Sequence, residues 1–203
     1  MPPKRNKTHI SESKAFSPLY TDQKFNIPQQ LDDKLLDSFT LFGEDNNTED
    51  LLLKDLGQFL RTYLKIPDKL LFFVNLEDFL MDGTDDIVDF EKYLYKGTLL
   101  LTLTENLPII DMYWDLLIDN LQSESPHNVL KKGKYDGTAD AEKYKIKLYI
   151  DDLSKLMKNL NDETPTSFLM EMLIVSNNGM KVYTDYFDFA LILGRIGELK
   201  EFT

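Results

Sequence analysis

One organisational unit constrains this chain more than any other feature: a helix, a polar loop and a second helix recur four times between about residue 30 and the C-terminus. Each helical stretch carries an apolar stripe with a period near 3.6 residues, as in Leu31, Leu35, Phe39 and Phe42. A short apolar or β-branched run follows each loop, for example Ile87-Val88. The recurrence predicts an all-α protein in which consecutive units bury their stripes together.

The four units fall into two lobes. Asn106-Leu107-Pro108 interrupts the helical pattern near the middle of the chain, so we expect an N-terminal lobe over 29–106 and a C-terminal lobe over 107–203. A polar stretch at 122–147 is expected to be an insertion in the third unit. Residues 1–28 hold several prolines and little apolar periodicity, which predicts a disordered basic tail. The expected helices cover about 31–42, 53–64, 68–74, 88–103, 109–121, 153–160, 168–175 and 186–196.

Charge narrows the possible partners. The chain has 23 Lys and Arg against 35 Asp and Glu, a net charge of −12; residues 1–30 carry +3, which leaves −15 for the rest. An acidic body of this kind repels phosphate backbones, so we expect no direct nucleic-acid binding by the folded part. A basic partner segment or a divalent cation is the more suitable complement. No apolar stretch reaches the length of a membrane span, and the N-terminus is too polar for a secretory signal.

Catalytic motifs are missing from the sequence. The chain has no Cys, which excludes thiolate chemistry, and its two His residues, His9 and His127, lack neighbours spaced as metal ligands. No Ser–His–acid arrangement or phosphate-binding glycine loop is present. Paired carboxylates such as Asp151-Asp152 are more often a solvated face or helix caps than an acid–base pair. We therefore predict that the protein is not an enzyme.

A 12-residue calcium-binding loop needs oxygen ligands at positions 1, 3, 5 and 12 and Gly at position 6. The first loop offers several oxygens but has Glu49 at position 6 and Asp55, too short for bidentate binding, at position 12. In the second loop Lys92 places a cation at position 12, and in the fourth loop Tyr186 stands there. The third is interrupted by the insertion. We expect structural turns that hold no metal and no other cofactor, with weak calcium binding left open for the first loop alone.

The four units and the central break resemble the calmodulin and centrin family of EF-hand proteins over roughly residues 30–203. Three stretches, GTDDIVDFEKYL, LLLTLTENLPIIDMYWDLLIDN and VSNNGMKVYTDYFDFALILGRIGELK, narrow the resemblance to degenerate centrin-like subunits of XPC-type damage-recognition complexes in yeast. The resemblance implies two lobes, each of two degenerate EF-hand units. It also implies a nuclear, non-catalytic protein that binds an amphipathic helix of the XPC-type protein and supports nucleotide excision repair.

A paired helix–loop–helix lobe usually receives its target helix in an apolar groove. We expect the C-terminal lobe to bind this helix, since its apolar residues are numerous and include several Met. The candidate groove or core residues are Trp114, Leu117, Phe168, Met172, Phe189 and Ile192.

Two other functions fit the same resemblance. One is a calmodulin-type calcium sensor, which would expose an apolar surface when calcium binds. The other is a light-chain-like centrin that clamps a cytoskeletal helix, for example at the spindle pole. The poor loops count against the sensor, and identifying the protein that co-purifies with this chain would separate the repair role from the cytoskeletal role.

Overall fold

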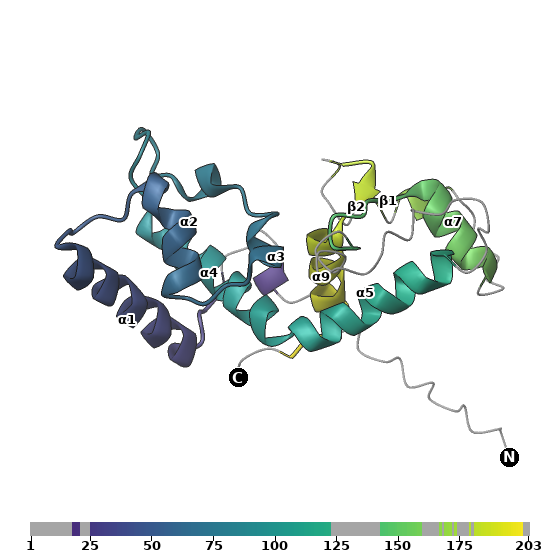
Figure 1. Cartoon of the computed structure of the whole chain (residues 1–203), viewed down its shortest axis with the longest axis horizontal. Helices are drawn as coiled ribbons and strands as arrows, with labels where there is room; N and C mark the ends of the chain where they lie inside the picture. The colour runs from purple at the N-terminus through teal and green to yellow at the C-terminus, as the bar shows by residue number, and fades with distance from the viewer. Residues whose placement is uncertain are drawn as a thin grey trace, which may run out of the picture.

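The computed structural model describes residues 18–20, 25–122, 143–159, 167, 169–171, 173, 179 and 181–200. These residues are mostly helical and include one small two-stranded sheet. The helices lie in two groups along the longest axis (Figure 1), with α4 and α5 running in sequence from the first group into the second. The first group holds α1 (Gln29–Asn46), α2 (Leu53–Thr62), α3 (Asp68–Leu71), the 3-10 turn η2 (Leu76–Phe79) and α4 (Phe90–Glu105). The second holds α5 (Leu107–Gln122), β1 (Leu148–Tyr149), α7 (Ile150–Asn159), β2 (Tyr183–Thr184) and α9 (Tyr186–Arg195).

The seven predicted helices that lie within the described residues are confirmed, and several of their ends differ from the predicted bounds, most clearly in α1 and α3. Helix α1 continues past Gly43 to Asn46, because Asn47 takes the left-handed conformation (φ 51°) and its N–H bonds the carbonyl of Gly43, which closes the last turn. Helix α3 is one turn long and ends at Leu71, where the prediction extended it to residue 74. The expected helix at 168–175 lies mostly outside the described residues.

Loops of consecutive units pair in both halves. In the first half Leu52 and Ile87 form an antiparallel bridge, with Val88 N–H donating to the Leu51 carbonyl at 3.0 Å. In the second half the runs after loops three and four form the sheet, Leu148 opposite Thr184 and Tyr149 opposite Tyr183. The description "all-α" is therefore incomplete, since short extended runs satisfy their backbone groups across the loop pair. This pairing joins unit one to unit two and unit three to unit four.

The first half has a dense aromatic core. Phe59 lies 5.3 Å from Phe42 and 5.5 Å from Tyr93 between ring centroids, and all three are fully or almost fully buried. The Tyr93 hydroxyl donates to the carbonyl of Leu35 at 2.9 Å, so α4 is fixed against α1. Aliphatic side chains of α2 and of the segment after it complete this core: Leu56, Leu60, Leu64 and Ile66.

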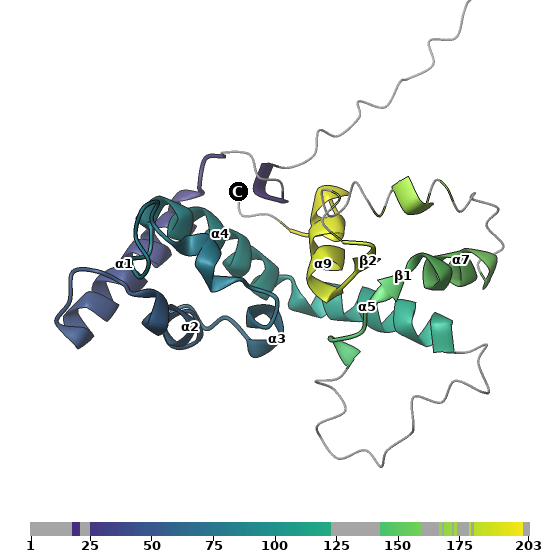
Figure 2. The ribbon, with the colours of Figure 1, turned by 90° about the horizontal axis from the view of Figure 1, so that it is seen from above.

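Contacts at the middle of the chain hold the two halves together. Asn106, between α4 and α5, exchanges two hydrogen bonds with the backbone of Lys200, at 2.8 and 2.9 Å. Asp111 on α5 accepts from Lys69 of α3 at 2.5 Å and from the Tyr186 hydroxyl of α9 at 2.6 Å. Asn106, where the domain boundary was predicted, follows the last residue of α4, and the halves share a partly buried polar junction there. Figure 2 shows α3 close to α5 and α9 at this junction.

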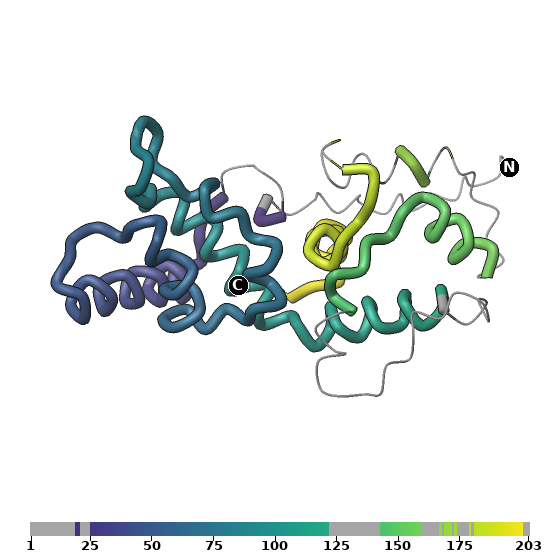
Figure 3. The backbone as a smooth tube through the Cα atoms, turned by 45° about the horizontal axis from the view of Figure 1, so that its top comes forward, coloured from purple at the N-terminus to yellow at the C-terminus, as the bar shows by residue number. Residues whose placement is uncertain are grey.

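Part of the expected tail is folded. Residues Pro18–Tyr20 form a 3-10 turn, and the Tyr20 ring is 2% exposed against α9. Arg195 donates through Nε to the carbonyl of Tyr20 at 2.8 Å. A Cβ at Gly194 would meet ring atoms of Tyr20 at 2.4 Å, so only glycine allows this approach. Figure 3 shows the purple segment beside the yellow helix. The expectation of a disordered tail over 1–28 is wrong at these residues, because Leu19 and Tyr20 are apolar enough to pack on the second half.

Two buried tyrosines predict alkaline instability. Burial raises the pKa of Tyr93 above its usual value, and burial with the hydrogen bond to Asp111 raises that of Tyr186. A raised folded-state pKa contributes stability below the unfolded value of about 10 that is lost as pH rises. Between pH 9 and pH 11 these two residues should together lower the free energy of unfolding by about 2–3 kcal/mol. Urea unfolding at both pH values tests this, and Tyr93→Phe should lose about half of the dependence.

Candidate functional site

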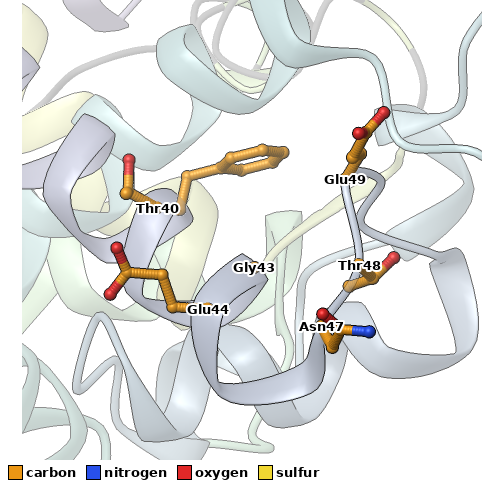
Figure 4. A pocket seen from close by; sticks show the side chains of 7 residues that line it. Thr40, Gly43, Glu44, Asn47, Thr48 and Glu49 are labelled. Carbon is orange, nitrogen blue, oxygen red and sulfur yellow. The ribbon is translucent and has the colours of Figure 1, made fainter.

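The first loop does not gather its candidate calcium ligands. Asn46 lies in α1 and donates to the carbonyl of Phe42 at 2.9 Å, and the Thr48 hydroxyl donates to the carbonyl of Asp50 at 3.0 Å. A cavity of about 530 Å³ beside the loop is lined by Phe39 and by polar and carboxylate side chains, but Glu44 and Glu49 lie on opposite sides of it (Figure 4). Among the described residues, no three His, Cys, Asp or Glu side chains cluster closely enough to hold a metal ion.

In the second loop an ammonium group contacts the loop oxygens. Lys92 Nζ donates to the Leu80 carbonyl at 2.7 Å and to Asp82 Oδ1 at 2.6 Å. The Asp89 side chain caps α4 by accepting the backbone N–H of Lys92 at 2.9 Å. The hydrogen bond to Asp82 raises the pKa of Lys92, and that of Asp82 is lowered by the same contact. The cation predicted at this position is confirmed.

In the fourth loop Lys181 occupies a similar environment, which the sequence did not reveal. Its Nζ lies 2.8 Å from Asp185 Oδ2 and 3.0 Å from each oxygen of Asp188. Burial lowers the pKa of Lys181, but the two carboxylates more than offset this and the pKa is raised. For Asp188, burial raises the pKa and the bond to Lys181 opposes the shift. The spacing Lys-x-x-x-Asp-x-x-Asp at the start of a predicted helix was the sequence feature from which these contacts of Lys181 could have been predicted.

Trp114, one of the candidate groove residues, lies in the core. Its side chain is 0% exposed, its Nε1 donates to the carbonyl of Lys143 at 3.0 Å, and its ring packs against Tyr186 and Phe189 at 5.6 and 5.4 Å. The sequence left open whether Trp114 lines a groove or fills the core, and in the structure it lies in the core. There its ring contacts position α9 on α5.

Three other candidates lie on half-buried helix faces. Leu117 on α5, and Phe189 and Ile192 on α9, are each partly exposed. Phe168 and Met172 lie outside the residues whose side chains are described. The structure adds Leu116, 53% exposed, and Ile196, 56% exposed. Ile196 follows Ile192 by one turn, so helical periodicity alone could have identified it. We use the name second-half apolar surface for the exposed or partly exposed apolar side chains Leu116 and Leu117 of α5, Phe189 and Ile192 of α9, and Ile196 just after α9.

Helix α7 supports the view that the second half is incompletely covered. Its sequence is strongly amphipathic, yet none of its residues is buried, and Leu153, Leu156 and Met157 all remain partly exposed. By contrast, α2 of the first half buries Leu56, Phe59 and Leu60. A helix whose apolar face is left partly in water by its own fold can accept another apolar surface.

Within the described ranges, no helix combines the length and the apolar character that crossing a bilayer needs.

Comparison with known proteins gives one informative match. No family model matches the chain, and no solved structure does. Among curated proteins, the chain is 27% identical over 176 residues to "DNA repair protein RAD33" of Saccharomyces cerevisiae, covering 86% of this chain and 89% of the relative. The similarity therefore extends through both halves and is that of a distant homologue.

Proposed function

From this distant homology to a yeast DNA repair protein, we propose that the chain is a non-catalytic, centrin-like accessory subunit in nucleotide excision repair. It binds and stabilises a helical segment of an XPC-type damage-recognition protein, and it acts in the nucleus. Homology over 86% of the chain supports the repair role. The acidic body, with −15 outside residues 1–30, favours contact with the protein partner rather than with DNA.

The centrin-like part of the proposal draws on the loop pairs. Loop one pairs with loop two, and loop three with loop four, and this pairing supports a division into two lobes of two units each. The four units are, on this proposal, degenerate EF-hands that keep the paired-loop scaffold. An ammonium group at the second loop suits a scaffold that works without calcium.

The helix-binding part rests on one observation, the partly exposed apolar faces of α5, α7 and α9 in the second half. An amphipathic helix would cover these faces with its own apolar stripe. Helix α2, which has the place of α7 in the first half, buries Leu56, Phe59 and Leu60, although other apolar side chains of that half, such as Leu41 and Phe72, are exposed. We therefore assign the partner helix to the second half.

Leu116→Asp and Ile192→Asp should weaken capture of a peptide spanning the partner's helical segment about ten- to a hundredfold, because each removes an anchor worth about 1.5–3 kcal/mol. Isothermal titration with the full chain measures the loss, and circular dichroism verifies the helix content. Leu41→Asp is the matched control, since Leu41 is a 50% exposed leucine on α1 of the first half. Equal binding by all three variants and the parent would refute the assignment to the second half.

A further inference from the structure

We propose that Lys181 is a built-in cation that holds the fourth loop and the start of α9 in place, so that the second-half apolar surface is formed without a divalent metal ion. The link to partner binding rests on the function proposed above. The role of Lys181 in the loop stands on its own contacts.

The ammonium of Lys181 contacts two nearly buried carboxylates. The side chains of Asp185 and Asp188 are 6% and 8% exposed, whereas that of Lys181 is 32% exposed. The same carboxylates form a capping box at the N-terminus of α9: Asp185 Oδ1 accepts the Asp188 N–H at 3.0 Å, and Asp188 Oδ2 accepts the Asp185 N–H at 3.2 Å. Lys181 thus bonds the residues that fix where α9 begins.

The charges in this cluster are close to balance. Two carboxylates are met by one ammonium and by the partial positive charge of the α9 N-terminus. Each carboxylate also accepts a backbone N–H in the capping box. A divalent ion would have to displace the ammonium and compete for oxygens that already have donors. Without Lys181, two nearly buried negative charges would face each other with only the helix terminus to offset them.

The first half carries a second ammonium of the same kind, at a different place in its unit. Lys92 is in the first turn of α4, after the second loop, and its Nζ reaches back to the Leu80 carbonyl and to Asp82. Lys181 instead precedes α9 and lies beside β2. Since the two lysines occupy different positions in their units, one ammonium is not simply a repeat of the other. Each half therefore has a lysine ammonium at the loop before its closing helix, but Asp82 is 95% exposed, so only Lys181 contacts nearly buried carboxylates.

Thermal unfolding of the full chain tests the proposal. The parent should melt at the same temperature in 1 mM EGTA and in a few millimolar CaCl₂. Lys181→Met should lower Tm by about 10 °C, because it leaves the two nearly buried carboxylates of Asp185 and Asp188 without their ammonium. Lys181→Arg should keep most of the Tm, since it keeps the charge. Lys155→Met is the control, because Lys155 is 61% exposed and makes only a 3.7 Å contact with Asp152; its Tm should not change.

A double variant separates charge balance from simple loss of packing. The variant Lys181→Met/Asp188→Asn removes one negative charge together with the ammonium, and the amide oxygen of the new side chain can still accept the Asp185 N–H. Its Tm should therefore be several degrees higher than that of Lys181→Met alone. Calcium-induced stabilisation of the parent, equal Tm values for Lys181→Met and Lys155→Met, or no recovery in the double variant would overturn the proposal. If these melting results hold while the parent fails to bind the partner helix, the built-in cation stands and the proposed function fails.

Discussion

Trp114→Ala is expected to lower the free energy of unfolding by about 3–5 kcal/mol, the range for truncating a fully buried large aromatic side chain. Trp114 is 0% exposed, and its ring holds Tyr186 and Phe189 of α9 against α5. The variant also leaves the carbonyl of Lys143 without the indole donor. Urea unfolding followed by circular dichroism measures the change.

Trp114→Phe is the matched control, since it keeps an aromatic ring and should cost clearly less than alanine. The same burial makes a spectroscopic prediction: binding of a partner helix should leave the emission maximum of Trp114 nearly unchanged, because the indole is already out of water. A loss below about 1 kcal/mol for Trp114→Ala would mean that Trp114 is a surface residue and not part of the core.

Asp111→Ala is expected to lower the free energy of unfolding by about 2 to 3 kcal/mol, because it removes a carboxylate that accepts from both Lys69 and Tyr186. The Lys69 and Asp111 side chains are 21% and 28% exposed, so the charge left behind is only partly hydrated. The halves should also lose cooperativity, which would appear as a broader or two-step urea transition.

Asp119→Ala on the same helix is the control, since Asp119 is exposed and should change stability by less than about 0.5 kcal/mol. A double-mutant cycle with Lys69→Met isolates the contact between the halves. The double variant should lose clearly less than the sum of the two single losses. Strict additivity would show that Lys69 and Asp111 do not stabilise each other.

The local architecture of this chain could be predicted from its sequence because helical periodicity and polar loops are local signals. The apolar stripes containing Leu56 and Tyr93 predicted the helices observed as α2 and α4. The short apolar run Ile87-Val88 was recognised after the second loop, and in the structure Ile87 pairs with Leu52. Lys92 was identifiable because it occupies a position where a calcium loop needs Glu. These inferences need only residue type and spacing.

Contacts between distant residues could not be predicted. The bond from Arg195 to Tyr20 spans 175 positions, and the bonds between Asn106 and Lys200 span 94. Lys181 gave a weaker signal than Lys92, because its role depends on two carboxylates that become buried only after α9 packs. Likewise, the spacing of Trp114 fits both a core and a groove, and only the packing of α9 over it decides between them.

The shared junction at Asn106 and Asp111 limits how a target could be grasped. The hydrogen bonds of Asn106 to Lys200 and of Lys69 to Asp111 link the two halves. The halves therefore cannot move toward each other around a bound helix unless these bonds break. A bound helix would therefore contact this protein on one side only. Its opposite side would remain accessible, so that another subunit of a larger assembly would have room to bind the same helix at the same time.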